Sequence, residues 1–247
     1  MIKKVINKVR SLKQKKLLSS NENKNNFFVT YRPDFHFKNN EFPNYDELFS
    51  VWTGLKSYKG DYGDMVRFYS LYLLLKYIDD NEIDGDIVEL GVYKGQTAKL
   101  FKTFFPNKQI HLFDTFGGFD EKDILEDKKH GVNTTKLFTD TSLDSVKKYI
   151  GGGNIKYYQG YFPDSAINLD ETIKYSIVHL DADLYQPMKA GLEYFYSKMA
   201  KGGVLIVHDY TNGFKGSRKA CDEFFKDKPE TMVPYADKSG TAVIIKI

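Results

Sequence analysis

A glycine-containing turn constrains this chain more than any other feature of its sequence. Residues 86–90 form a short, mostly apolar run, Gly91 and Gly95 follow it, and residues 97–105 form an amphipathic run. This order predicts a strand, a tight turn and a helix, the first unit of an α/β fold. Glycine lets the backbone approach a ligand closely, and the first N–H groups of a helix lack helical partners. The segment therefore predicts a binding site at the end of the first core strand.

The spacing of this turn indicates the kind of ligand. Glu89-x-Gly91-x-x-x-Gly95 differs from the Gly-x-Gly-x-x-Gly turn that binds a pyrophosphate and from the phosphate loop that ends in Gly-Lys-Ser/Thr. It suits a smaller cofactor without a phosphate, chiefly S-adenosylmethionine (SAM), and on the spacing alone a plain turn between strand and helix is an equal alternative. We assign six residues of this segment to the cofactor: Glu89, Gly91, Tyr93, Gly95, Gln96 and Thr97.

Length and composition bound the class of protein. The 247 residues, 41% hydrophobic and 15% aromatic, suffice for one α/β domain with an extension. Cys221 is the only cysteine, which excludes a disulfide framework and a cysteine-based metal site and favours a reducing compartment. No apolar run approaches the ~20 residues of a membrane span, and the N-terminus lacks the apolar stretch of a secretory signal. We expect a cytoplasmic protein.

Positive charge is concentrated at the N-terminus. Residues 1–20 hold seven basic and no acidic residues, so the remainder of a chain of net charge +3 is mildly acidic. Such a body argues against a nucleic-acid partner. Apolar residues recur at helical spacing between Ile2 and Leu12, which predicts a basic amphipathic helix over residues 1–18. This helix could lie on the inner face of an anionic membrane, or dock on the protein body or a partner subunit.

The rest of the chain reads as a helical region followed by one α/β domain. We divide the whole chain into three parts: 1–27 (basic helix and polar linker), 28–84 (helical cap or substrate region, with helices at 45–56 and 63–79) and 85–247 (catalytic domain). Predicted strands are 86–91, 109–114, 154–159, 175–181 and 203–208, and predicted helices are 96–105, 141–150, 187–199 and 217–226. Near-continuous apolar strands indicate a parallel sheet covered on both faces.

The C-terminus predicts a different pairing. The five-residue turn 236–240 separates two strand-like segments, and so short a turn joins only antiparallel strands. The expected fold is α/β: a doubly wound, mostly parallel sheet with an antiparallel C-terminal hairpin and an N-terminal helical extension. This arrangement resembles the class I SAM-dependent methyltransferase fold.

Acidic residues end four of the five predicted parallel strands: Glu89, Asp114, Asp181 and Asp209. Ligands in open α/β sheets lie beyond these carboxyl ends. Asp114 ends the second strand and suits the two ribose hydroxyls of SAM, and we assign it to the cofactor together with Thr115. Asp181 and Asp209 end adjacent strands, and two converging carboxylates either share a proton or bind a hard cation.

The histidines and tyrosines near these strands have plainer alternatives. Strand alternation would turn His208 away from Asp209, so we weigh it as a metal ligand against a buried imidazole. His111 and His179 lie inside strands and read as core histidines with partners. Three tyrosines near the end of the third strand fit either adenine stacking or core packing: Tyr157, Tyr158 and Tyr161.

Four segments carry a family resemblance: 85–92, 113–119, 181–185 and 202–210. In this order they resemble the macrocin and mycinamicin sugar O-methyltransferase family over about residues 60–230. The resemblance implies SAM, a divalent cation (Mg²⁺ or Mn²⁺), a sugar or glycoside acceptor and a homo-oligomer. It places Asp181 and Asp209 as metal ligands and Asp181 also as the catalytic base. One departure is His208, where family members known to bind Mg²⁺ carry Asp.

Three other functions explain the sequence less well. Asp181-Ala182-Asp183 matches the Asp-x-Asp motif of metal-dependent glycosyltransferases, but that function leaves the glycine turn and the terminal hairpin unexplained. A NAD-dependent reductase requires a different glycine spacing. A non-catalytic SAM-fold binding module is the remaining alternative. We expect acceptor specificity to depend on the region 45–70 and on two predicted loops, 118–140 and 210–217.

Overall fold

The computed structural model describes residues 44–54, 64–129, 135–211 and 214–247, all within one compact unit, Asn44–Ile247. The predicted basic helix and linker, 1–27, lie outside the described residues, so this helix remains a prediction. Helices α3 and α4, which the sequence predicts before the sheet, belong to the same compact unit as the sheet.

One seven-stranded sheet forms the centre of this unit, in the order β3-β2-β1-β4-β5-β7-β6. Strands β1 to β5 pair in parallel, whereas β7 pairs antiparallel with both β5 and β6. The predicted mostly parallel sheet with an antiparallel C-terminal hairpin is therefore confirmed. The strands are β1 (Asp86–Leu90), β2 (Ile110–Asp114), β3 (Ile155–Gln159), β4 (Tyr175–Leu180), β5 (Met199–Val207), β6 (Val233–Pro234) and β7 (Ala242–Ile245).

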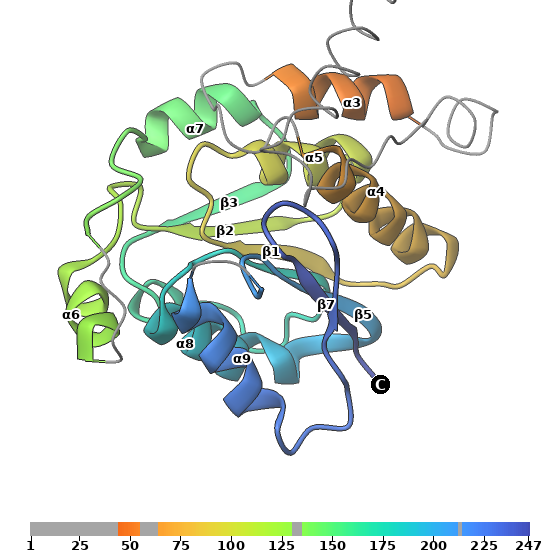
Figure 1. Cartoon of the computed structure of the whole chain (residues 1–247). Helices are drawn as coiled ribbons and strands as arrows, with labels where there is room; N and C mark the ends of the chain where they lie inside the picture. Colours follow the sequence, from red (N-terminus) through yellow and green to blue (C-terminus); the bar gives the residue numbers. More distant parts are fainter. Residues whose placement is uncertain (1–43, 55–63, 130–134, 212–213) are drawn as a thin grey trace, which may run out of the picture. The chain divides into compact units, whose positions relative to one another are not determined.

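Helices cover both faces of the sheet, as Figure 1 shows. On one face lie α3 (Tyr45–Gly54), α4 (Met65–Asp80), α5 (Gln96–Phe104) and α7 (Leu143–Ile150). On the other lie α8 (Tyr185–Phe195) and α9 (Lys215–Phe225), with α6 (Glu121–Lys129) beside α8. Because β4 is central and covered on both faces, every one of its residues is buried.

Helix α4 begins at a well-defined cap. The carboxylate of Asp64 accepts from the backbone N–H of Arg67 at 3.0 Å, which satisfies one of the unpaired donors of the first turn. The other oxygen of Asp64 accepts from the backbone N–H of Lys238, at 2.8 Å, in the loop between β6 and β7. The start of α4 is thereby fixed beside the C-terminal hairpin.

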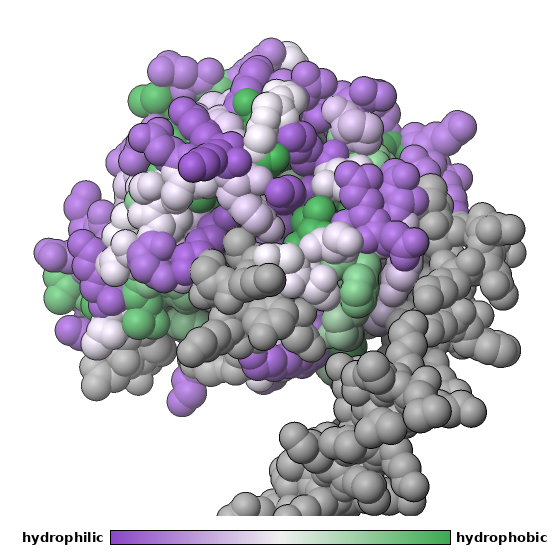
Figure 2. Space-filling model, turned by 90° about the horizontal axis from the view of Figure 1, so that it is seen from above, coloured by the Kyte–Doolittle hydropathy of each residue, from purple (hydrophilic) through white to green (hydrophobic). Residues whose placement is uncertain are grey.

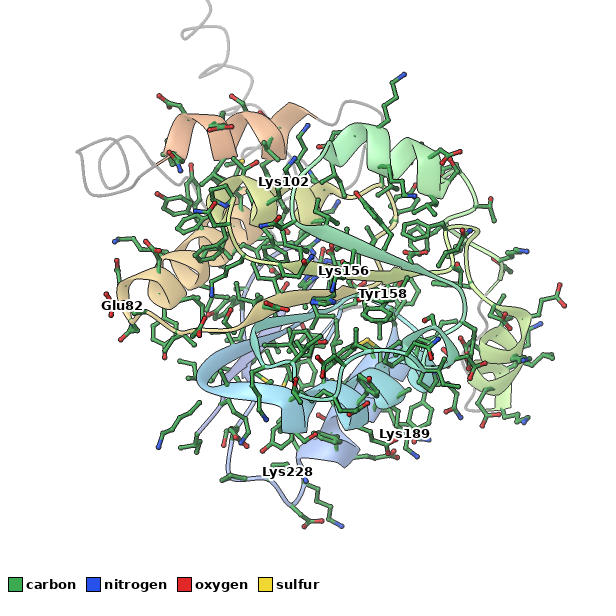
Figure 3. The ribbon with its side chains drawn as sticks, turned by 180° about the vertical axis from the view of Figure 1, so that it is seen from behind. Glu82, Lys102, Lys156, Tyr158, Lys189 and Lys228 are labelled. Carbon is green, nitrogen blue, oxygen red and sulfur yellow. The ribbon has the colours of Figure 1, made fainter. Side chains whose placement is uncertain are left out.

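Side chains also join helices that cover the same face. Lys102 of α5 donates through Nζ to the backbone oxygen of Ile150 at the end of α7, at 3.1 Å. Figure 3 shows Lys102 on its helix and Tyr158 within the sheet, on β3. Tyr158 stacks on Phe113 of β2 with ring centroids 4.3 Å apart. Tyr158 therefore packs in the core, which is the plainer of its two predicted roles.

The structure differs from the sequence prediction in three elements. Helix α6 forms inside the segment 118–140, which the sequence predicts as a loop. Its acidic first turn and basic last turn stabilise a helix through the helix dipole, but its apolar residues are too few to produce a periodic pattern. Helix α8 ends at Phe195 rather than at residue 199, and a 3₁₀ turn, Tyr196–Lys198, leads into a β5 that begins earlier than predicted.

The described helices are all too short or too polar to cross a lipid bilayer. Seen from above, the molecule presents mostly hydrophilic residues, with hydrophobic ones in small separate groups (Figure 2).

Candidate active site

A cavity of about 340 Å³ opens at the carboxyl ends of β1, β2, β4 and β5. All four acidic residues that the sequence places at strand ends line it: Glu89, Asp114, Asp181 and Asp209. Of the other residues predicted to bind the cofactor, Gly91, Tyr93, Gln96, Thr97 and Thr115 also line the cavity, whereas Gly95 does not. The glycine turn and the acidic strand ends thus form one site.

Gly91 is required by the protein chain itself. Its φ is +87°, and a Cβ at this position would lie 2.1 Å from the backbone oxygen of Asp181. The ends of β1 and β4 are also joined by a hydrogen bond from the N–H of Asp181 to the oxygen of Leu90, at 2.8 Å. The sequence indicates a close approach between glycine and ligand, but the close approach seen here is to the end of β4.

Gly95 and Gln96 start helix α5. Gly95 has a φ of +82°, and a Cβ here would lie 2.9 Å from the side chain of Ile150. The Gln96 amide donates to the backbone oxygen of Trp52 at 2.7 Å, so it ties α3 to the turn. Both residues support the walls of the site.

Asp114 holds the glycine turn in place. Its Oδ2 accepts from the N–H groups of Val92 at 2.7 Å and Tyr93 at 2.8 Å, and its Oδ1 accepts from the N–H of Phe116 at 2.6 Å. A carboxylate oxygen has two lone pairs, so Oδ1 retains capacity for a ribose hydroxyl. The hydroxyl of Thr115 donates to the oxygen of Gly118 at 2.7 Å.

A short segment, 138–141, lies against the glycine turn. The Asp140 carboxylate accepts from the Tyr93 hydroxyl and from the Lys94 ammonium, each at 2.6 Å. Thr141 donates to the backbone oxygen of Tyr93 at 2.6 Å, and the ring of Phe138 packs edge-on against that of Tyr93. Phe138 and Thr141 line the cavity, so this segment forms part of its wall.

At the ends of β4 and β5 lies a cluster of possible metal ligands: Asp181, Asp183, His208 and Asp209. Each offers one ligand atom, and these atoms lie within 4.8 Å of one another. The convergence predicted for Asp181 and Asp209 is therefore present. Asp183 is an addition, since the sequence marks it only as part of the Asp-x-Asp alternative.

His208 points into this cluster. Its Nδ1 lies 2.7 Å from Oδ1 of Asp181 and 3.0 Å from Oδ2 of Asp209. Regular strand alternation would turn His208 away from Asp209, but β5 ends at Val207 and Asp209 has a left-handed φ of +56°, so of the two alternatives the structure places the imidazole among the possible metal ligands. The left-handed residue brings two consecutive side chains to the same side.

Arg67 of α4 reaches the cluster from outside the sheet. Its guanidinium Nη2 lies 3.2 Å from Oδ2 of Asp181 and 3.4 Å from Nε2 of His179, and the side chain is 4% exposed. Its Cζ lies 5.8 Å from the centre of the Trp52 ring. Sequence reasoning did not identify Arg67, and the one available signal is a lone cation within the apolar first half of α4.

The charges within the cluster shift several pKa values. Burial and the nearby Arg67 would lower the pKa of His208, but Asp181 and Asp209 outweigh them and raise it to about 9. Burial alone would raise the pKa of Asp181, yet His208 and Arg67 hold it well below its usual range. Asp181 is therefore a carboxylate between two cations at neutral pH.

The pKa values of Asp183 and Glu89 are raised, in contrast to that of Asp181. Burial, the charge of Asp181 and a hydrogen bond with Asp209 raise the pKa of Asp183 well above its usual value. Burial and the charge of Asp181 likewise raise the pKa of Glu89. Both groups hold a proton more readily than an exposed carboxyl does.

His179 links Glu89 to Arg67. Burial lowers the pKa of His179 to about 3, so its ring is neutral at neutral pH. Arg67 can only donate, so Nε2 of His179 accepts and Nδ1–H donates to Oε1 of Glu89 at 3.0 Å. His179 is thus a buried histidine with partners, as predicted, but it borders the active site.

The other predicted core positions agree with the structure. His111 is buried between Asp86, at 2.9 Å, and the hydroxyl of Tyr158, at 3.0 Å. Cys221 is buried. Tyr161 lines the cavity, and its hydroxyl donates to Oδ1 of Asp123 at 2.9 Å.

Known proteins support the resemblance seen in the sequence. Residues 63–243 match the family described as macrocin-O-methyltransferase (TylF). Demethyldecarbamoylnovobiocin O-methyltransferase of Streptomyces niveus is 24% identical over 144 residues, a match that spans 53% of this chain and about half, 54%, of that protein. A tetracenomycin-C 4'-O-methyltransferase of Streptomyces olivaceus, named for a dimethoxy-rhamnosyl substrate, is 20% identical over 72% of this chain and 71% of its own length.

The fold has a close counterpart among solved structures. The O-methyltransferase NovP superposes with a TM-score of 0.68 at 19% identity, over 81% of this chain and 97% of that one. The enzyme class predicted from the sequence, an O-methyltransferase, is the class for which the matched family is named. On the strength of the match over residues 63–243, this chain belongs to the macrocin O-methyltransferase family.

Proposed function

We propose that this protein transfers a methyl group from SAM to a hydroxyl of a sugar or glycosylated small molecule. The observation that carries the proposal is a single cavity with the glycine turn and Asp114 on one side and the cluster Asp181, Asp183, His208 and Asp209 on the other. The first group suits the nucleoside of SAM. The second suits a hydroxyl that must lose a proton.

The reaction is an in-line displacement. The acceptor oxygen forms a bond to the methyl carbon, the bond from that carbon to sulfur breaks, and S-adenosylhomocysteine leaves. Alignment of oxygen, carbon and sulfur is therefore the main task of the walls of the site. A carboxylate within hydrogen-bond reach takes the hydroxyl proton, and we assign this role to Asp181. His208 and Arg67 lower the pKa of Asp181, which weakens it as a base. Asp183, whose pKa is raised, is the second candidate, because it is the stronger base when it is ionised.

The donor set of the cluster fits a divalent cation. Three carboxylates suit Mg²⁺ or Mn²⁺, and an imidazole favours Mn²⁺ over Mg²⁺. Asp181, Asp209 and, once its ring has given up the second proton, His208 would hold the ion, with Asp183 as a further ligand. When bound there, a cation lowers the pKa of a coordinated hydroxyl.

The choice of a glycoside acceptor is supported by the name of the relative from Streptomyces olivaceus, which gives a dimethoxy-rhamnosyl tetracenomycin as its substrate, and the relative from Streptomyces niveus is likewise named for a small molecule, demethyldecarbamoylnovobiocin. We expect methyl transfer when radiolabelled SAM is supplied with a panel of glycosides and nucleotide-activated sugars. Aglycones that lack the sugar should remain unlabelled. Labelling of the aglycones alone would move the acceptor to another class.

Ligand binding tests the function against its rivals. By isothermal titration calorimetry the protein should bind SAM and S-adenosylhomocysteine, and should bind neither a UDP-sugar with Mn²⁺ nor NAD. Binding of the UDP-sugar without SAM would instead support the glycosyltransferase, in which Asp181-Ala182-Asp183 holds the nucleotide through the metal. Binding of SAM without turnover on any acceptor would leave the non-catalytic binding module.

A further inference from the structure

Asp123 is a buried carboxyl that the proposed chemistry does not use. It lies in the first turn of α6, is 5% exposed and lines the cavity. The hydroxyl of Tyr161 donates to its Oδ1 at 2.9 Å. Within the part of the chain that the structure describes, this carboxyl has no other hydrogen bond. Its second oxygen, Oδ2, is thus available to a donor in the cavity.

The position of Asp123 follows from the strand order. Tyr161 comes directly after β3, and β3 and β2 lie on the opposite side of β1 from β4 and β5. Methyl transfer occurs near Asp181 and Asp209, at the ends of β4 and β5, and Asp114 at the end of β2 suits the ribose. The base of the same nucleoside therefore extends past β2 toward β3, where Tyr161 and Asp123 lie.

The walls of this part of the cavity suit a flat, apolar ring. Phe119, Tyr161 and Phe162 line it, and aromatic side chains pack well against the face of a purine. On the basis of the proposed function, we propose that Asp123 selects adenine by accepting a hydrogen bond from its exocyclic amino group. Asp123 is then a specificity-determining residue for the methyl donor, supplied by a helix that the sequence does not predict.

The cost of burying Asp123 supports this assignment. Burial raises the pKa of Asp123 to about 6, although the hydrogen bond from Tyr161 acts against this rise. A buried carboxyl with too few donors is destabilising, and an amino group placed against Oδ2 supplies the missing one. A base with a carbonyl oxygen in place of the amino group would set one acceptor against another.

The preference of the site for adenine can be measured without knowledge of the acceptor. S-adenosylhomocysteine and S-inosylhomocysteine differ at the edge of the base that the proposal sets against Asp123: the amino group on C6 is replaced by a carbonyl, and the neighbouring N1 gains a hydrogen. We expect the full chain to bind the adenine compound at least about 10-fold more tightly by calorimetry, the scale of one hydrogen bond to a charged group. Equal affinities for the two compounds would overturn the proposal, and this comparison needs no variant.

Asp123→Asn gives the second measurement. Because Tyr161 donates to Oδ1, the amide oxygen should face Tyr161 and the amide NH₂ should face the cavity, where it can donate to the inosine carbonyl. The preference for adenine should fall to about 1 or invert, while the fold, checked by thermal unfolding, is retained. Glu126→Gln makes the same change of charge on α6, at a residue that does not line the cavity, and should keep the wild-type preference.

The outcomes separate this inference from the proposed function. A wild-type preference retained in a folded Asp123→Asn variant removes Asp123 from adenine selection and leaves the methyltransferase proposal intact. Failure of the wild-type protein to bind either compound contradicts both.

Discussion

Single residues decide how the cluster is assembled. Asp209 and Asp183 both have left-handed backbones, with φ of +56° and +61°. Such a conformation is uncommon outside glycine, and aspartate and asparagine tolerate it best. Asn is therefore the substitution that tests the charge of these residues with the least change in backbone strain.

Asp181→Asn and Asp209→Asn should each lower kcat by at least about 10²-fold, the scale of a lost acid–base or charge contribution. The affinity for SAM should change much less, because we assign SAM binding to the glycine turn and Asp114. Steady-state kinetics and calorimetry on the same preparations measure both quantities. Asp144→Asn, on exposed α7, is the control. An equal loss of SAM affinity would place these residues in the cofactor site instead.

Gly91→Ala should destabilise the fold by about 3 kcal/mol, because the new methyl group would overlap the backbone of Asp181 at a left-handed position. Urea unfolding measures this free energy. Gly152→Ala is a matched control, since a Cβ at Gly152 has no atom within 4 Å. Similar stability of the two variants would contradict the packing role of Gly91.

At the scale of elements, α4 supplies a side chain to the cluster at the ends of β4 and β5 as well as packing against the sheet. Arg67 on this helix is one of two cations that flank Asp181, and the sequence assigned the helix only to a cap or substrate region. Periodicity predicted α4 almost to the residue, because its buried face is apolar. It did not predict the role of Arg67, since a helical pattern does not show which distant strand end a polar side chain will meet.

Arg67→Gln should cost about 3 kcal/mol of stability, because it leaves the Asp181 carboxylate without one of its two cations in a largely buried place. Lys76→Gln, on the same helix, removes an exposed pair with Asp80 and should cost less than about 1 kcal/mol. Chemical denaturation of the two variants compares these losses. If both lose the same small amount, the pair of Arg67 and Asp181 contributes no more than a surface pair.

The end of β7 depends on one carboxylate. Glu230 accepts from Lys246 at 2.7 Å, from the hydroxyl of Tyr196 and from the N–H of Ile247 at 3.2 Å. Burial would raise the pKa of Glu230, but Lys246 and Tyr196 outweigh it and lower the pKa to about 2 from 4.5. A lowered pKa in the folded state contributes stability above pH 4.5, and this contribution is lost as the pH falls toward 2.

Glu230→Gln should therefore flatten the fall in stability between about pH 5 and 2. Urea unfolding at several pH values measures this slope. Lys246→Met removes the main partner of Glu230 and should flatten this slope as well. The double variant should flatten the slope little more than either single variant does. Unchanged slopes would show that this cluster is not linked to acid unfolding.

On the scale of the whole molecule, the cluster balances its charges without a metal ion. Arg67 and protonated His208 face the acidic side of the cluster, where Arg67 contacts Asp181 and His208 contacts both Asp181 and Asp209, while burial and its acidic neighbours raise the pKa of Asp183. We expect EDTA to abolish turnover and leave the melting temperature nearly unchanged, and Mn²⁺ to restore turnover better than Mg²⁺ because of the imidazole. Thermal unfolding and activity measured in the same buffers test this. Full activity after exhaustive chelation would leave Asp181 or Asp183 as a metal-free base.

The sequence predicted the sheet, its order of elements and the four acids on its rim, because buried parallel strands are continuous apolar runs and their ends are chemically distinct. It did not predict α6, because this helix has too few apolar residues to show a helical periodicity. It left the orientation of His208 open, because this depends on the left-handed backbone of Asp209. It missed two side chains whose positions depend on tertiary geometry, Arg67 of α4 and the carboxyl of Asp123.

The attachment of α4 to the site limits how this enzyme can be re-engineered. The segment before the sheet brings Arg67 to Asp181 and is anchored through Asp64 to the loop between β6 and β7. A chimaera that takes this segment from a relative would also replace the charge beside Asp181 and break the contact between Asp64 and the loop before β7. Chimaeras designed to change the acceptor should therefore keep Arg67, Asp64 and the loop between β6 and β7 together.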